Sequence, residues 1–232
     1  NDFSSLLPLA TKSTKHSARS KAVFALYSQG VKTNRDEWVW DFGQSPVLER
    51  VDYLLGAYRK AAKTLPVDAN ENTITDIVGT EIKWTRKLKK LLLSRTKLLK
   101  DPKKIVRALY RPFVSKELYF AWELNEDWYQ LGQLFPSGQT NRAIVFTDTS
   151  PRSPFSVLAC GGPFEHHLAA STDSFQGVSS HRFDDQGARH ENITDWAIDQ
   201  FKKHYTPGRE KARRPITKDA IFHYVYGVLH DP

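Results

Sequence analysis

The hydrophobic residues of this chain recur with two different periods, and these periods separate predicted strands from predicted helices. Short runs rich in β-branched and aromatic residues, bounded by polar stretches, predict strands. These runs cover residues 22–27, 38–42, 106–110, 118–122, 144–147 and 156–160. Apolar residues at helical spacing predict helices over residues 45–58, 80–95 and 128–134, and two more that begin at about residues 192 and 217.

Residues at the expected starts of these helices fit that assignment. Ser45 suits an N-cap and Pro46 suits the first helical position. Asn192 and Asp195 have the spacing of a capping pair, and Thr217 precedes the last apolar helix. The remaining long stretches, which are polar or rich in Ser, Gly and His, predict irregular chain at residues 1–20, 65–75 and 161–188.

These elements predict an α+β fold. We expect a twisted, mainly antiparallel sheet built from residues 105–180, flanked by helices from both ends of the chain. With 232 residues, 40% of them hydrophobic, the chain is long enough for one sizeable core or for two small cores packed together.

The composition narrows the class of protein. No apolar run approaches the roughly 20 residues that span a bilayer, and no basic-then-apolar leader opens the chain. Cys160 is the only cysteine, which excludes an internal disulfide and fits a reducing compartment. We therefore expect a cytoplasmic protein without a membrane partner.

Positive charge is concentrated in one segment. The chain has a formal net charge of +8, yet residues 83–107 contain eleven Lys and Arg against Asp101 as the one acid. On the predicted helix over 80–95, Trp84 and three leucines share one face and cations cover the other. Such a concentration favours a polyanionic partner, although a solvated face or a membrane-surface helix has the same stripe. The cations predicted to contact DNA phosphates are Lys83, Arg86, Lys87, Lys89 and Lys90.

Reading a base sequence needs planar groups that bond bidentately, such as Arg for guanine and Asn or Gln for adenine. Side chains of these kinds, and one serine, stand in predicted loops. The candidate base-reading residues are Asn34, Arg35, Gln139, Asn141, Arg142, Arg152 and Ser153. Each of them is equally compatible with an ordinary solvent-exposed turn.

Motifs that carry catalysis are missing from the sequence. There is no phosphate-binding P-loop, no G-x-G-x-x-G, no G-x-S-x-G, no zinc spacing and no aromatic-prolyl tetrapeptide of an amino-methyltransferase. We therefore expect no catalytic centre and no cofactor in this chain.

Two weaker patterns keep other chemistry open. Asp68, Glu81 and Lys83 have the order of a Mg²⁺-dependent nuclease site, but that chemistry needs a strand where we expect a helix to open at Glu81. Cys160, His166 and His167 could ligate a metal, but no fourth ligand stands at a familiar interval. A protein-docking module with a basic face is the remaining alternative.

Seven segments, in order, resemble one known family. They are GVKTNRDEWVWDF (30–42), KWTRKLK (83–89), ALYRPF (108–113), LFPSGQTNRAI (134–144), PFSVLA (154–159), NITDWAIDQFKKHY (192–205) and ITKDAIFHYVYGVLH (216–230). The chain, from about Phe3 onward, is similar to the C-terminal specificity region of Type ISP restriction–modification enzymes. Residues 60–80 and 181–190 match only loosely.

The resemblance implies a division of labour within a fused polypeptide of bacteria or archaea that defends against phage. A nuclease, a helicase-like translocase and an adenine-N6 methyltransferase would precede this chain and use Mg²⁺, ATP and S-adenosylmethionine. Residues 1–75 would form the junction with the methyltransferase, as a strand pair plus a helix. Residues 76–232 would recognise the target in double-stranded DNA, with Arg111 of the ALYRPF segment as a further phosphate contact.

Overall fold

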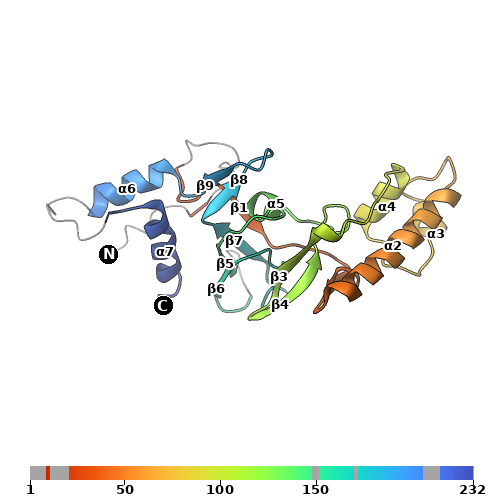
Figure 1. Ribbon diagram of the computed structural model, residues 1–232, viewed down its shortest axis with the longest axis horizontal. Coiled ribbons are helices and arrows are strands. Elements are labelled where there is room, and N and C mark those ends of the chain that lie inside the picture. The colour runs from red at the N-terminus through yellow and green to blue at the C-terminus, as the bar shows by residue number, and fades with distance from the viewer. Residues whose placement is uncertain (1–8, 11–20, 148–151, 170–171, 206–214, 232) are drawn as a thin grey trace.

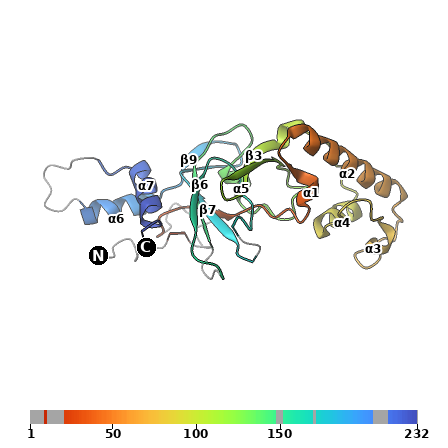
Figure 2. The ribbon, with the colours of Figure 1, turned by 90° about the horizontal axis from the view of Figure 1, so that it is seen from below.

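The chain folds into an elongated molecule with helices at both ends and strands between them (Figures 1 and 2). The computed structural model describes residues 9–10, 21–147, 152–169, 172–205 and 215–231. The predicted lead-in over residues 1–20 therefore lies almost wholly outside the described residues.

A four-stranded antiparallel sheet forms the middle of the molecule. Its strands are ordered β1 (Tyr27–Gln29), β7 (Phe175–Ser179), β5 (Ala143–Thr147) and β6 (Val157–Cys160). In β5, Val145 lies in one hydrophobic core and Ile144 in a second. Because successive side chains of a strand point to opposite faces, this sheet is covered on both sides.

A second antiparallel sheet lies beside the first. It contains β2 (Trp40–Asp41), β4 (Val114–Tyr119) and β3 (Ile105–Arg111), in that order, and the 3-10 turn Pro102–Lys104 leads into β3. A separate hairpin pairs β8 (His181–Phe183) with β9 (Arg189–Glu191).

Helices cover the two sheets from opposite ends of the molecule (Figure 1). The first core packs α1 (Asp36–Val39), α2 (Gln44–Thr64), α3 (Ile74–Ile77), α4 (Arg86–Leu93) and α5 (Leu131–Leu134) with the three-stranded sheet. The second core packs α6 (Asp195–Tyr205) and α7 (Lys218–Val228) against the other face of the four-stranded sheet.

The predicted α+β class, the antiparallel pairing and the flanking helices from both chain ends are confirmed. The strands over 106–110, 144–147 and 156–160 are found close to their predicted bounds. The prediction of a single sheet is wrong, because the strands of residues 105–180 are divided between the four-stranded and the three-stranded sheet. The boundary at residue 75 stays a prediction, although the first core joins residues from both sides of it, such as Val51 and Leu88.

The prediction of irregular chain over residues 161–188 is wrong. That segment contains β7, which pairs with both β1 and β5. Gly177 hides the strand from sequence reasoning, because glycine has low strand propensity. Its lack of a side chain is needed here, since a Cβ would lie 2.8 Å from the ring of Phe164 and 3.0 Å from Val145.

The first two predicted strands and the strand over 118–122 are shifted. Residues 36–39 form a helical turn before a two-residue strand, and β1 begins only at Tyr27. The strand predicted over 118–122 instead runs from Val114 to Tyr119, because the chain turns after Tyr119. The Asn125 side chain stabilises this turn by donating to the carbonyls of Tyr119 and Ala121.

Several helices begin at residues other than those predicted, because a local hydrogen bond or a tertiary contact determines where each helix starts. Gly43 rather than Ser45 precedes α2. The basic helix begins at Arg86 rather than at residue 80, because the Thr85 hydroxyl caps it by accepting from the Leu88 amide. Asn192 is not a cap: its side chain accepts from the amide and donates to the carbonyl of Leu26, the residue before β1. Thr194 caps α6 instead. The Thr217 cap of α7 is confirmed.

Candidate nucleic-acid interface

The basic helix α4 presents its cations away from the first core. Leu88, Leu91 and Leu92 are buried, so the helix has the predicted apolar face. Trp84 precedes the helix and stacks on Tyr58, with ring centroids 6.2 Å apart. Lys83 also precedes the helix and is exposed.

Acids from elsewhere in the sequence meet much of the positive charge of residues 83–107. Arg86 lies 3.4 Å from Glu126, and Lys90 lies 3.4 Å from Glu71. Three further ion pairs join Lys100 to Asp52, Lys104 to Glu123 and Arg107 to Glu117. The Lys90–Glu71 pair is exposed on both sides, and such a pair contributes only about 0–1 kcal/mol, so a phosphate can replace the Glu71 carboxylate at little cost. The Arg86 side chain is exposed, but its partner Glu126 is buried.

Lys87 differs from its neighbours because its ammonium is held by the protein. Nζ donates to the carbonyls of Asn125 (2.6 Å) and Trp122 (3.1 Å) and lies 4.8 Å from the centroid of the Trp122 ring. Burial lowers the pKa of Lys87, against the attraction of nearby carboxylates. The Lys89 ammonium, by contrast, donates to the Thr75 hydroxyl, at 2.9 Å, near the surface.

The structure separates Asn34 from Arg35. Asn34 is exposed and has a φ of 53°, a conformation that asparagine tolerates better than most residues. The side chain of Arg35 is buried, with 3% exposed, and donates to the hydroxyl of Thr85 at the start of α4. Burial lowers the pKa of Arg35 to about 10, while Glu126 raises it. Arg35 thus connects the 30–36 loop to the basic helix.

Arg111 is the last residue of β3. Its guanidinium lies 4.1 Å from the centroid of the Tyr110 ring and 3.0 Å from Glu165 Oε2. Glu165 is buried, and this burial raises its pKa to about 7 even though the charge of Arg111 lowers it. Arg111 therefore faces a carboxyl group whose charge changes near neutral pH.

Arg152 and Ser153 are connected to Glu165 through Asp173 and His167. Their backbone N–H groups each donate to a carboxylate oxygen of Asp173, at 2.8 Å. His167 Nδ1 lies 3.2 Å from the Asp173 carbonyl, and the Glu165 carboxylate accepts from the His167 amide at 2.7 Å. The side chain of Arg152 is exposed, so this loop is fixed through its backbone while its cation faces solvent.

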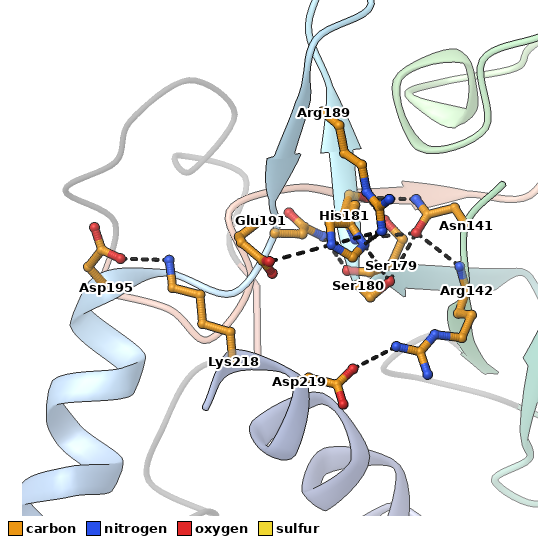
Figure 3. A network of polar contacts seen from close by, with 11 residues as sticks. Asn141, Arg142, Ser179, Ser180, His181, Arg189, Glu191, Asp195, Lys218 and Asp219 are labelled. Carbon is orange, nitrogen blue, oxygen red and sulfur yellow. Dashed lines mark hydrogen bonds and ion pairs between the residues drawn. The ribbon is translucent and has the colours of Figure 1, made fainter. Parts of the chain in front are cut away.

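The three candidates of the 137–142 loop have different surroundings. The Asn141 side chain is buried beside Ser180 and His181, whereas Arg142 reaches Asp219 of α7 at 2.6 Å (Figure 3). Gln139 is exposed. The loop thus turns one candidate inward and two outward, which its sequence does not indicate.

An exposed aromatic side chain was missed by sequence reasoning. Phe113 stands in the turn between β3 and β4, with a φ of 62° and 89% of its surface exposed. Lys116 of β4 lies 3.9 Å from the Tyr110 centroid and 4.9 Å from that of Phe42. The available signal was the turn dipeptide Pro112–Phe113, because proline marks turns and a phenylalanine has no packing partner at the tip of a hairpin.

The residues of the alternative nuclease and metal sites do not come together as a site in the described residues. Asp68 lies in an exposed turn after α2, and Glu81 and Lys83 lie in exposed chain before α4, so the helix expected to open at Glu81 is not formed there. Cys160 donates to the Gly162 carbonyl, and burial raises its pKa to about 12. In the described ranges no three His, Cys, Asp or Glu side chains group as metal ligands, and no helix is long and apolar enough to cross a membrane.

Three solved structures are similar to this chain. The cryo-EM structure of a DrdV–DNA complex superposes with a TM-score of 0.84 and is 33% identical over 97% of this chain. A nuclease-deletion mutant of the Type ISP restriction–modification enzyme LlaGI, in complex with a DNA substrate mimic, superposes with a TM-score of 0.77 and is 25% identical over 99% of this chain. The ATP-dependent Type ISP restriction–modification enzyme LlaBIII bound to DNA superposes with a TM-score of 0.79 and is 22% identical over 99% of this chain. At that identity the likeness is one of fold alone.

This chain spans 22%, 16% and 14% of the lengths of those three chains, respectively. The comparison with curated proteins gave no match. The family model described as the Type ISP C-terminal specificity domain matches residues 22–232, which is nearly the whole chain. The chain therefore belongs to the family of Type ISP C-terminal specificity domains.

Proposed function

We propose that this chain recognises a specific sequence in double-stranded DNA, as one part of a larger restriction–modification polypeptide. The observation that carries the proposal is the similarity to the DNA-bound DrdV structure, at 33% identity over 97% of the chain. The family match over residues 22–232 supports the same function.

Phosphate contacts would come from cations whose carboxylate partners are replaceable. Lys90 fits this role, because both members of its 3.4 Å pair with Glu71 are exposed. Arg86 would use its exposed guanidinium while Glu126 stays buried beside it. Lys83 and Lys89 extend the same surface. Such contacts set the position of the duplex without reading its sequence. Arg111, held by Tyr110 and Glu165, would add a contact at the end of β3.

Base reading would come from the exposed members of the predicted set. Asn34, Gln139, Arg142 and Arg152 present their side chains to solvent, and Ser153 is half-buried beside Arg152. Arg35 and Asn141 are buried, and their side chains would stabilise the loops that carry the exposed base-reading residues.

The remaining activities would belong to other domains of the polypeptide. A nuclease, a translocase and an adenine methyltransferase would bind Mg²⁺, ATP and S-adenosylmethionine, and no residue of this chain is assigned to any of them. This chain would be no enzyme by itself, and its partners would be the duplex and the methyltransferase domain. A cytoplasmic location follows from that role.

Selection from a random duplex library tests the proposal. The purified protein should enrich one sequence motif, and its affinity for that motif should fall steeply with salt. Binding that shows the same salt dependence but enriches no motif would contradict sequence recognition. Binding to an acidic protein with no affinity for DNA would favour the docking alternative, and Mg²⁺-dependent cleavage lost with Glu81→Ala would favour the nuclease.

A further inference from the structure

The turn between β3 and β4 holds an aromatic side chain in an unfavourable conformation. Arg111 pairs with Val114 across the turn, so Pro112 and Phe113 are its two central residues. Proline followed by a residue at positive φ is the pattern of a type II turn, in which the second position is normally glycine or asparagine. Phe113 occupies that position with a φ of 62°.

Folding gains little from a phenylalanine at this position. Of the aromatic side chains that the structure describes, that of Phe113 is the most exposed, at 89%. Its ring is therefore in water in the folded protein, and its Cβ strains the backbone where glycine would not. An apolar side chain that is both strained and exposed is better suited to a binding partner than to the core.

The surroundings of the turn indicate which partner this is. Arg111 and Lys116 flank Phe113 on the two strands, and Lys116 has no carboxylate within salt-bridge distance among the described residues. A two-stranded ribbon fits a groove of duplex DNA, and apolar side chains at the tips of such elements can enter the base stack. Cations beside the ring would meet the phosphates on either side of it.

A groove next to the turn offers a second type of partner. Its lining includes Pro112, Phe113, Phe155, Val157 and Leu229. A protein surface docked there would cover Phe155, which is 52% exposed, together with Phe113. Arg111 and Lys116 favour DNA, because an apolar protein contact gains nothing from two adjacent cations.

We propose that the ring of Phe113 enters the base stack of the bound duplex and unstacks one base step, with Arg111 and Lys116 on the flanking phosphates. This inference rests on the DNA recognition proposed above. It assigns to the hairpin a role in deforming the duplex, and hence in favouring sequences that contain an easily unstacked step, such as TA or CA.

The test uses duplexes that contain the selected motif, with 2-aminopurine placed in turn at each position, because its fluorescence rises when it is unstacked. The wild-type protein should raise the fluorescence at one step. Phe113→Gly should abolish that rise and weaken binding about 10-fold. Glycine relieves the positive φ, so this variant should keep or raise the wild-type Tm, which separates loss of the ring from misfolding. Phe113→Trp should restore the signal, and Phe155→Ala is the matched control that should leave it unchanged.

The outcomes separate this inference from the proposed function. If the wild-type protein enriches a motif but Phe113→Gly has unchanged affinity and an unchanged fluorescence signal, the inference is wrong and the DNA recognition stands. If Phe155→Ala and Phe113→Gly weaken DNA binding equally without any change in 2-aminopurine fluorescence, the groove contacts the duplex without unstacking it, and the inference is wrong. A wild-type protein that binds no DNA would overturn both proposals.

Discussion

Replacing Asn141 by alanine would remove a buried amide that makes five hydrogen bonds to two other segments and to its own neighbour. Its Nδ2 donates to the carbonyls of Leu134 (2.8 Å) and His181 (2.7 Å). Its Oδ1 accepts from the Arg142 amide (2.9 Å), the Ser180 hydroxyl (3.0 Å) and the His181 amide (3.3 Å). Figure 3 shows this network next to the Arg142–Asp219 pair.

The magnitude follows from the groups left unpaired. Asn141 is 7% exposed, so alanine would leave two carbonyls without these donors in a region that water hardly reaches. Each buried polar group that loses its partner costs about 1–3 kcal/mol. Allowing for partial rehydration, we expect a loss of about 3 kcal/mol in the free energy of unfolding. For a chain of 150–250 residues, this lowers Tm by roughly 6–12 °C.

Urea and thermal unfolding, followed by circular dichroism, would measure this loss. Gln139→Ala is the matched control, because it removes an exposed amide from the same loop and should change stability by less than about 0.5 kcal/mol. Asn141→Asp should destabilise at least as much as alanine, since it places a carboxylate oxygen against two carbonyls. The reasoning is refuted if Asn141→Ala keeps wild-type stability and instead flattens the preference at one base pair, because Asn141 would then read a base.

Three further predictions concern binding and pH. Replacing Lys89 and Lys90 together by alanine should weaken all duplex sequences alike and reduce the salt slope of log Kd by about two; a loss confined to the preferred sequence would show that they read bases instead. Arg142→Ala should change stability by at most about 1 kcal/mol, since its pair with Asp219 is exposed, but should flatten preference at one or two adjacent positions; an unchanged ranking of single-base variants would leave this loop an ordinary turn. Because burial raises the folded pKa of Glu165 to about 7, the folded state holds a proton that the unfolded state releases above about pH 4.5. The free energy of unfolding should therefore fall as pH rises from about 4.5 to 7, and Glu165→Gln should flatten this fall. Identical pH profiles for the wild-type protein and the variant would refute the raised pKa.

Local patterns in the sequence were sufficient to predict many of the elements and the family. The strands at 105–111, 143–147 and 157–160 follow from runs of β-branched and apolar residues, and the last helix follows from the Thr217 cap and its apolar spacing. These signals are local because strand and helix periods depend on neighbouring residues. The order of seven short motifs identified the family that the match over residues 22–232 confirms.

The tertiary structure alone decided which candidate side chains face solvent. Arg35 meets Thr85 fifty residues away, and Asn141 meets His181 forty residues away, so no local pattern could show that these two side chains are inside. The same holds for the basic segment, whose Lys90 meets Glu71 from a distant turn. Residue type and spacing determined which chemistry the chain carries, but burial and ion pairing depend on contacts between segments that are far apart in the sequence.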